Sequence, residues 1–375
     1  MIIHTAEYRA EIKPKSFLAL LCIADKTDYI DKKSGCISKY TINYKDLGFS
    51  IITILAILKP NITAEILDYK NIRTIDIMKC YIKIQVNYSN LFDTKCRCEL
   101  LYNGEENLIE YYFNRARDQT SEYIPTFEKF HLHRVDYAID LILPSQDYIN
   151  NYVRMFSKAG LNKYFKSGGN YSTSISEHTK SYNYNFYAKG KERENTQIKE
   201  LFKYGVSNIT KQEIKNTENT FRIEIQCQKS KLKRIENKGK PLINFTTSRD
   251  LILSDIQQKF WTGSCYKLEY LRDNVIPNVF KSRTKIKNAL NLIQYISQNN
   301  HTVRQAIKNA EAITGITSQT AKNTLNEIHK YRGTDGFYTC IIPLTVRANI
   351  SYLPDIVPMI ENKFNEQILR LQTIK

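Results

Sequence analysis

The chain has no long hydrophobic run. Its longest predominantly apolar segment, Phe49–Leu58, has about ten residues, whereas a membrane-spanning helix needs about 20. The N-terminus also lacks the charged and then apolar pattern of a signal peptide. These absences predict a cytoplasmic protein that has no membrane partner.

Paired cysteine motifs are absent too. The eight cysteines occur singly except for Cys96-Arg97-Cys98, and no CxxC spacing occurs. Zinc ribbons and disulfide-stapled domains depend on regularly spaced cysteines, so the sequence suggests neither. Without a fixed-period repeat or a low-complexity tract, we expect ordinary globular domains.

Acidic residues are too few to balance the basic ones. Lys and Arg number 55 against 38 Asp and Glu, which gives a net charge of +17. A field of this sign attracts polyanions. The 26 Tyr and 16 Phe supply rings that can stack on unpaired bases. A basic protein that its charge merely keeps soluble is the alternative, but the combination favours nucleic-acid binding.

The length of 375 residues allows two or three domains of about 150 residues each. Residues 1–75 carry no recognisable chemistry, 76–245 are rich in strand patterns, and 246–375 are mostly helical. The sequence therefore predicts an α+β fold, with an antiparallel sheet covered by helices on one side and followed by a helical domain. Periodicity predicts strands over 80–86, 133–143, 182–188 and 220–228, and helices over 147–159, 191–204, 303–312 and 318–330.

Two predicted strands carry acidic residues on a polar face. Because side chains alternate across a strand, Arg134, Asp136 and Asp140 share one face, opposite apolar residues. Arg222 and Glu224 lie in the same way on a later strand. Carboxylates that converge from neighbouring strands can hold Mg²⁺ or Mn²⁺, which polarises a phosphodiester. A half-exposed sheet with ordinary Arg–acid cross-strand pairs is the alternative.

A tyrosine lies on the polar side of a third predicted strand. Alternation places Tyr187 opposite the aromatic residues at 182, 184 and 186. Lys189 and Lys191 follow where the strand gives way to a helix, and their charge would favour a phenolate or hold a phosphate. Tyr187 is therefore a candidate nucleophile, although most tyrosines are simply packed or lie at the surface.

The three segments Arg134-Val-Asp136, Tyr187-Ala-Lys189-Gly-Lys-Glu192 and Arg222-Ile-Glu224 resemble, in order and spacing, the gene II replication proteins of filamentous phages and related phage and plasmid replication proteins. They are more loosely similar to the trans-acting Rep initiators of small Gram-positive plasmids. The resemblance covers about residues 80–250.

This resemblance implies an initiator of rolling-circle replication that nicks and rejoins origin DNA. Tyr187 would attack a phosphodiester, keep the 5′ end as a phosphotyrosine and release a 3′-OH primer. Asp136 and Glu224, with Asp140 as a third candidate, would bind the metal ion. The expected partners are single- and double-stranded origin DNA, a host helicase and a polymerase, in the cytoplasm of the host cell.

His131-Leu132-His133 offers a second candidate metal site, because two histidines around an apolar residue, with a later tyrosine, also occur in HUH nickases. In a regular strand, both histidines would share the face of Val135 and not that of Asp136. Only a bulge could bring both sets to one side. Either set would support the same reaction.

The C-terminal part carries a helix-turn-helix pattern. Thr302 begins one predicted helix, residues 314–317 form a turn, and 318–330 form the next helix. The second helix turns outward four side chains of types that read the major groove: Gln319, Lys322, Asn323 and Asn326. With 333–340 as a wing, the pattern resembles a winged helix-turn-helix, and a plain helical hairpin is the alternative.

Other functions remain open at this point. A mobilisation relaxase or a transposase would use the same chemistry on another substrate. A DNA-binding regulator would bind without cleavage. A tyrosine recombinase is disfavoured, since the helical half has no convincing Arg, His-x-x-Arg and Tyr set.

We predict that nucleic-acid binding weakens steeply with salt. Each neutralised phosphate should contribute a slope of roughly −0.9 on duplex DNA, or −0.7 on a single strand, to a plot of log affinity against log salt. Binding titrations over a range of salt concentrations measure this slope. An affinity that does not change with salt would contradict the assignment to nucleic acid.

Overall fold

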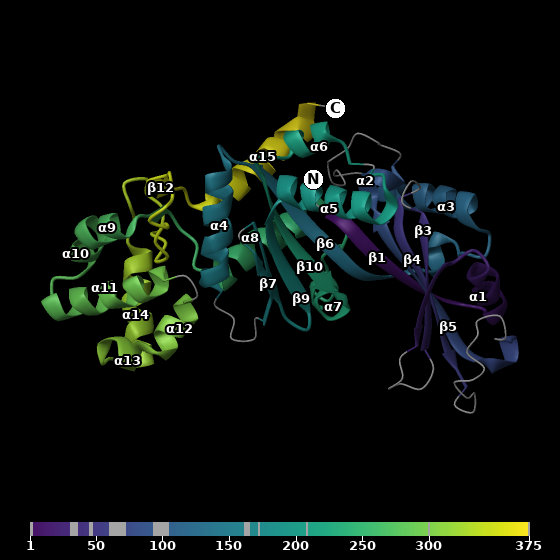
Figure 1. Ribbon diagram of the computed structural model, residues 1–375, viewed down its shortest axis with the longest axis horizontal. Helices are drawn as coiled ribbons and strands as arrows, with labels where there is room; N and C mark the ends of the chain where they lie inside the picture. The colour runs from purple at the N-terminus through teal and green to yellow at the C-terminus, as the bar shows by residue number, and fades with distance from the viewer. Residues whose placement is uncertain are drawn as a thin grey trace. The chain divides into compact units, whose positions relative to one another are not determined.

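The computed structural model describes residues 3–30, 37–44, 48–59, 73–92, 105–160, 166–171, 173–207, 209–298 and 301–373, shown in Figure 1. The chain divides into two compact units, one of Met1–Ala138 with Gln226–Ser248 and one of Ile139–Ile225 with Arg249–Lys375. Cys96-Arg97-Cys98 lies outside the described residues.

The first unit contains the strand order β2-β3-β4-β5-β1-β6, and every strand pairing that the structure gives for it is antiparallel. Its elements are β1 (Ile3–Ile12), α1 (Pro14–Leu21), β2 (Asp25–Ile30), β3 (Ile37–Tyr44), β4 (Phe49–Leu58), β5 (Ile77–Asn87), α2 (Tyr88–Leu91), α3 (Ile109–Thr120), β6 (His131–Ile142) and α7 (Lys229–Glu236). Residues 1–75, to which the sequence assigned no role, thus supply β1 to β4.

The two faces of this sheet differ in chemistry. On one face, Tyr8 of β1 is buried and shares a 2.7 Å hydrogen bond with the Tyr88 hydroxyl. The ring of Phe113, on α3, lies 5.0 Å from that of Phe49 on the same apolar side. On the other face, Glu7, Arg9 and Glu11 of β1 lie opposite polar residues of β5.

The second unit contains the strand order β6-β10-β9-β8-β7 and a separate pair, β11-β12. Its strands after β6 are β7 (Lys166–Tyr171), β8 (Ser174–His178), β9 (Tyr182–Ala188), β10 (Thr220–Gln228), β11 (Cys265–Tyr266) and β12 (Tyr352–Leu353). Its helices are α4 (Gln146–Ala159), α5 (Lys189–Tyr204), α6 (Lys211–Asn216), α8 (Phe245–Lys259), α9 (Leu268–Tyr270), α10 (Ile276–Val279), α11 (Arg283–Ser297), α12 (Val303–Lys308), α13 (Ala310–Thr314), α14 (Ser318–Lys330) and α15 (Ile356–Thr373). β6, β10 and α8 include residues of both units.

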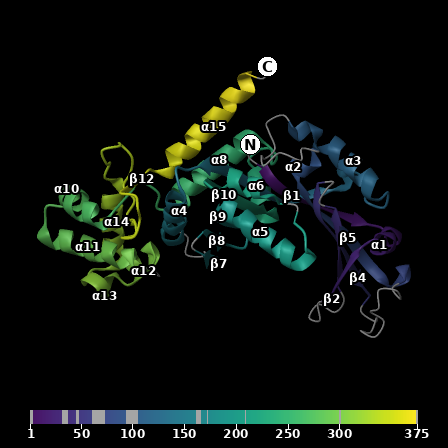
Figure 2. The ribbon, with the colours of Figure 1, turned by 45° about the horizontal axis from the view of Figure 1, so that its top comes forward.

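Aromatic side chains pack α4 and α8 against β9. Phe156 of α4 stacks on Phe186 with 3.9 Å between ring centroids, and Phe260 meets Phe186 edge-on at 5.2 Å. The Tyr184 hydroxyl donates a 2.6 Å hydrogen bond to Asp255 of α8. Figure 2 shows α4, α8 and β9 in one view. This packing buries one face of β9 and leaves the other for polar residues.

Most elements predicted around the candidate site are confirmed. The strands over 182–188 and 220–228 and the helix over 318–330 have the predicted bounds, and the other strands and the helices 147–159 and 191–204 are shifted by one to three residues at an end. The helix predicted over 303–312 is wrong as one element, because the backbone leaves helical geometry at Asn309 and forms α12 and α13 instead. Within the described ranges, no helix is long and apolar enough to cross a membrane.

A buried lysine closes the C-terminal end of α11. Lys158, on α4, is 3% exposed, and its ammonium donates to the carbonyl oxygens of Ile296, at 2.6 Å, and of Gln298 and His301. The last carbonyls of a helix lack intrahelical donors and carry partial negative charge. Lys158 therefore ties α4 to the helical part of the second unit.

We predict that Lys158→Met destabilises the protein by about 2–4 kcal/mol, because it removes a buried donor and leaves buried carbonyl groups unsatisfied. Lys287→Met, the same substitution at an exposed position of α11, should alter stability by less than about 0.5 kcal/mol. Denaturant unfolding of both variants measures the difference. Equal stabilities of the two variants would show that Lys158 does not cap α11.

Candidate functional site

Tyr187 and Glu224 meet on the polar face of the second unit. Tyr187 belongs to β9 and points away from the buried Tyr184 and Phe186, as alternation predicts. Its hydroxyl donates a 3.4 Å hydrogen bond to Oε2 of Glu224 on β10, and Asn185 donates to Oε1 at 3.0 Å. A phenol thus lies next to a carboxylate that can accept its proton.

The environment of Tyr187 keeps its phenol protonated. Burial and the neighbouring Glu224 carboxylate raise the pKa of Tyr187 well above its ordinary value, although Arg222 opposes them. The sequence suggested that the following lysines would favour a phenolate. That interpretation is corrected here, because desolvation and a carboxylate dominate, so a general base must remove the proton during any reaction.

Asp140 is held between two cations. Arg222 donates to both carboxylate oxygens, at 2.6 and 2.7 Å, and Lys189 donates to Oδ2 at 2.8 Å. The pKa of Asp140 stays well below its ordinary range because these charges outweigh the effect of burial. This ion-paired cluster joins β6, β10 and Lys189, the first residue of α5. Tyr187 lies two residues before Lys189 on the chain, and Glu224 lies two residues after Arg222.

A glycine permits α5 to begin here. A Cβ atom at Gly190 would lie 2.8 Å from Glu218 Cα and 3.0 Å from the Thr217 carbonyl oxygen. The helix start therefore packs directly on the backbone that leads into β10. The sequence offered no sign of this close approach, which positions Lys189.

Lys191 does not join this cluster. It is exposed, and its ammonium pairs with Glu194 of its own helix at 2.8 Å. Of the two predicted catalytic lysines, the structure thus brings only Lys189 near the candidate nucleophile, and it pairs that residue with Asp140.

In the first unit, a β-bulge reorganises the start of β6. Glu7 of β1 pairs with Arg134, but Tyr8 pairs with Leu132, so His133 is an extra residue on β6. Arg9 pairs with His131, which places His131 on the polar face with Glu7. The regular strand that the sequence suggested for both histidines is corrected by this bulge.

Three basic side chains surround the carboxylate of Glu7 on this polar face. Lys83 of β5 lies 2.9 Å from its carboxylate, His133 Nδ1 lies 3.2 Å away, and Arg134 lies 3.8 Å away. Arg134 also donates to both oxygens of Asp136, each at 2.9 Å. The sequence pattern did not reveal Glu7, because β1 alternates only weakly and most of its side chains are buried.

The donor sets as they stand do not fit a divalent cation. Among the described residues, no three His, Cys, Asp or Glu side chains gather closely enough to hold one. Asp136 and Asp140 are bound bidentately by arginines, and Glu224 accepts from Asn185 and Tyr187. Asp136 and Glu224 lie in different units. The Mg²⁺ or Mn²⁺ requirement and the alternative site at His131 and His133 remain predictions.

Three of the four predicted DNA-reading residues lie on the exposed face of α14. Gln319, Lys322 and Asn323 are exposed and Asn326 is half-buried, whereas Ala321, Leu325 and Ile328 are buried. Gln319 donates a 3.0 Å hydrogen bond to Asn323. After α14, Arg332 and Tyr338 form a single antiparallel bridge, and of these two residues only Tyr338 lies in the predicted wing, 333–340.

No family model matches the chain, and a comparison with curated proteins also finds no match.

We predict that Asp140→Asn destabilises the protein by about 3 kcal/mol, because it leaves Arg222 and Lys189 as buried, uncompensated charges. Since the folded pKa of Asp140 is lowered, its ionic contribution is complete above the unfolded pKa of about 3.9 and is lost as the pH falls below that value. Asp250→Asn, which removes a half-exposed pair with Arg249, is the matched control and should cost at most about 1 kcal/mol. Unfolding measured at pH 7 and pH 3 tests both statements, and equal losses in the two variants would contradict them.

Proposed function

We propose that the chain nicks and rejoins DNA strands by transesterification on Tyr187, as an initiator of rolling-circle replication. The single observation that carries the proposal is the contact of the Tyr187 hydroxyl with Glu224 on the polar face of β9 and β10. The net charge of +17 supports a polyanionic substrate.

Glu224 acts as the general base in this scheme. It takes the phenol proton as Tyr187 Oη attacks the phosphorus atom, so that the nucleophile need not exist as a free phenolate. The new bond joins phosphorus to Tyr187 Oη, and the bond from phosphorus to O3′ breaks. The leaving O3′ receives a proton and becomes a 3′-OH, which a polymerase can extend. One phosphate ester replaces another, so the reverse reaction rejoins the strand without a nucleotide cofactor.

Arg222 and Lys189 position the reacting groups in this proposal. Their shared bond to Asp140 fixes the start of α5 and the register of Glu224 on β10. Because their charges exceed that of Asp140, one positive charge remains in the cluster to offset phosphate charge. The predicted divalent ion would add polarisation of the phosphodiester, and its binding would require the carboxylates to exchange their present partners.

The helices α11 to α14 would select the DNA sequence. The exposed Gln319, Lys322 and Asn323 of α14 are residue types that bind base edges in the major groove. A helicase and a polymerase of the host would act on the nicked product. If the chain bound DNA without cleaving it, the exposed surface of α14 would instead support the alternative function of a DNA-binding regulator.

Tyr187→Phe should abolish strand cleavage while fold and DNA binding persist, because only the nucleophilic oxygen is lost. The substrate is a pool of single-stranded oligonucleotides of random sequence, with and without Mg²⁺ or Mn²⁺. A 3′-labelled pool should become linked to the protein in denaturing gels, whereas a 5′-labelled pool should release shorter strands that end in 3′-OH. Tyr182→Phe, at a buried position of the same strand, should retain activity.

Glu224→Gln should slow adduct formation by about 10²–10⁴-fold, the usual contribution of a general base. The amide preserves the shape of the side chain and its hydrogen bonding, so folding should be maintained, and circular dichroism checks this. Undiminished adduct formation in Tyr187→Phe would overturn the proposed nucleophile, and undiminished rates in Glu224→Gln would overturn the proposed base.

A further inference from the structure

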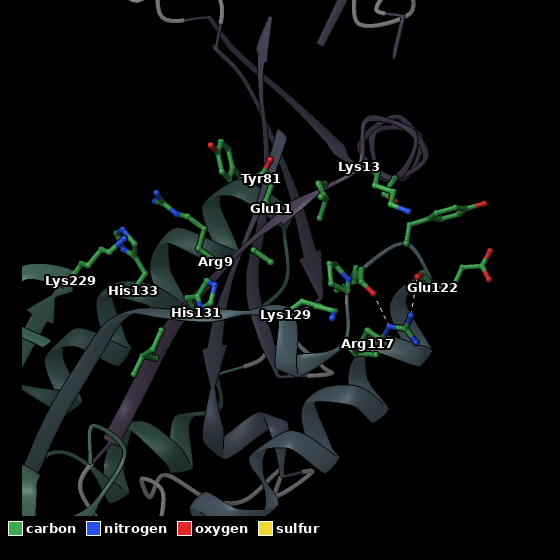
Figure 3. A pocket seen from close by; sticks show the side chains of 18 residues that line it. Arg9, Glu11, Lys13, Tyr81, Arg117, Glu122, Lys129, His131, His133 and Lys229 are labelled. Atoms are coloured by element: carbon green, nitrogen blue, oxygen red, sulfur yellow. Dashed lines mark hydrogen bonds between the residues drawn. The ribbon is translucent and has the colours of Figure 1, made fainter. Parts of the chain in front are cut away.

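The first unit contains a cavity of about 760 Å³ beside the start of β6, drawn in Figure 3. It lies over β1, β5 and the start of β6, and the loop after α3 closes one side. None of its lining residues belongs to the unit that carries Tyr187. The cavity therefore shares no lining residue with the candidate site around Tyr187.

Positive charge dominates the lining. Five side chains carry a permanent positive charge, against the two acids Glu11 and Glu122: Arg9, Lys13, Arg117, Lys129 and Lys229. In Figure 3, Arg9, His133 and Lys229 lie at one end of the cavity, and Lys129 and Arg117 lie toward the other. Cations at both ends suit an extended anion better than a single small ion.

Basic side chains surround His133 at the first end. Burial and the nearby charge of Arg9 lower the pKa of His133, Glu7 opposes this, and Lys229 and Lys83 lower it further. Arg9 Nε is buried and has no hydrogen-bond partner among the described residues. Such a buried donor is costly unless a ligand or water accepts its hydrogen bond.

The bulge at His133 builds this end of the cavity. A regular strand would turn His131 toward the apolar face, whereas the extra residue brings it opposite Arg9 and lets both histidines line the cavity. Bulges commonly redirect side chains beside functional sites.

Two aromatic side chains face the same cavity. Tyr81 comes from β5 and Tyr123 from the loop after α3. Arg117 fixes that loop by donating to the carbonyl oxygens of Ile124, at 2.7 Å, and Glu122, at 2.9 Å. A ring beside a cationic groove is the arrangement that stacks unpaired bases while the backbone is neutralised. Paired bases have no free face to offer.

We propose that this cavity binds a segment of single-stranded nucleic acid, with Lys129, Lys229 and Arg9 on its phosphates and Tyr81 or Tyr123 on its bases. The shared chemistry, a phosphate ester attached to an aromatic base, also fits a free nucleotide, and the test separates the two. The proposal rests on the proposed function only for the choice of a nucleic acid as the occupant.

The test measures fluorescence anisotropy of a labelled oligothymidine titrated with the full chain that carries Tyr187→Phe, so that cleavage cannot interfere. Lys129→Gln combined with Lys229→Gln should lower affinity at least tenfold and reduce the log–log salt slope by about 1.4, at roughly 0.7 for each phosphate contact on a single strand. Tyr81→Leu should lower affinity about fivefold or more and leave the salt slope unchanged, because it removes stacking only. Lys59→Gln combined with Lys79→Gln removes equal charge from exposed positions of the same unit outside the cavity and should have little effect.

Equal affinities of the cavity variant and this control would overturn the proposal. Thymidine monophosphate that competes as well as the oligonucleotide would also overturn it, in favour of a free nucleotide. Loss of binding in the cavity variant would support it even if the wild-type chain cleaved nothing, so failure of the nicking proposal is distinguishable from failure of this one.

Discussion

The ion pair between Asp140 and Arg222 is the constraint on which the candidate site depends. Arg222 is 2% exposed, and a guanidinium in such a place requires a carboxylate with matching geometry. Asp140 supplies it from β6 and also accepts a hydrogen bond from Lys189 at the start of α5. This cluster thereby fixes three elements around Tyr187 and Glu224. The hydrogen bond between Tyr187 and Glu224 is 3.4 Å long, which is too long to hold these elements in place by itself.

The acidic residues of the two polar faces differ in their partners and therefore in their roles. Asp136 and Asp140 are saturated by arginines, so they organise the sheet. Glu224 accepts hydrogen bonds from the Asn185 amide and the Tyr187 phenol. This contact with the candidate nucleophile is why the proposed chemistry assigns the base to Glu224.

Alternation of polar and apolar residues predicted much of this arrangement. It identified β9 and β10 with their bounds, and it placed Tyr187 opposite Tyr184 and Phe186. The burial of those rings against Phe156 and Phe260 explains why the pattern was reliable. A face that must be buried allows only one register.

Pairing between distant residues could not be read in this way. Alternation placed Asp140 and Arg222 on the polar faces of their strands. It could not show that they pair with each other, because long-range register is not encoded locally. The bulge at His133 changes the face of two histidines with no glycine or proline to signal it. Glu7 escaped notice for a related reason, since β1 alternates weakly and most of its side chains are buried.

The polar face of the sheet in each unit thus carries a different kind of chemistry in our account. In the second unit, a phenol and a carboxylate suit group transfer. In the first, cations, imidazoles and tyrosines suit the holding of an unpaired strand. The proposed nicking and rejoining of a strand would use both.

Peptide mass spectrometry of the covalent adduct tests the central claim most directly. After reaction with single-stranded DNA and digestion of both polymers, the account predicts a 5′-phosphorylated nucleotide on the peptide that contains Tyr187, at that residue. A nucleotide on Tyr182, Tyr184 or any other side chain would contradict the assignment of the nucleophile and of the face from which it acts.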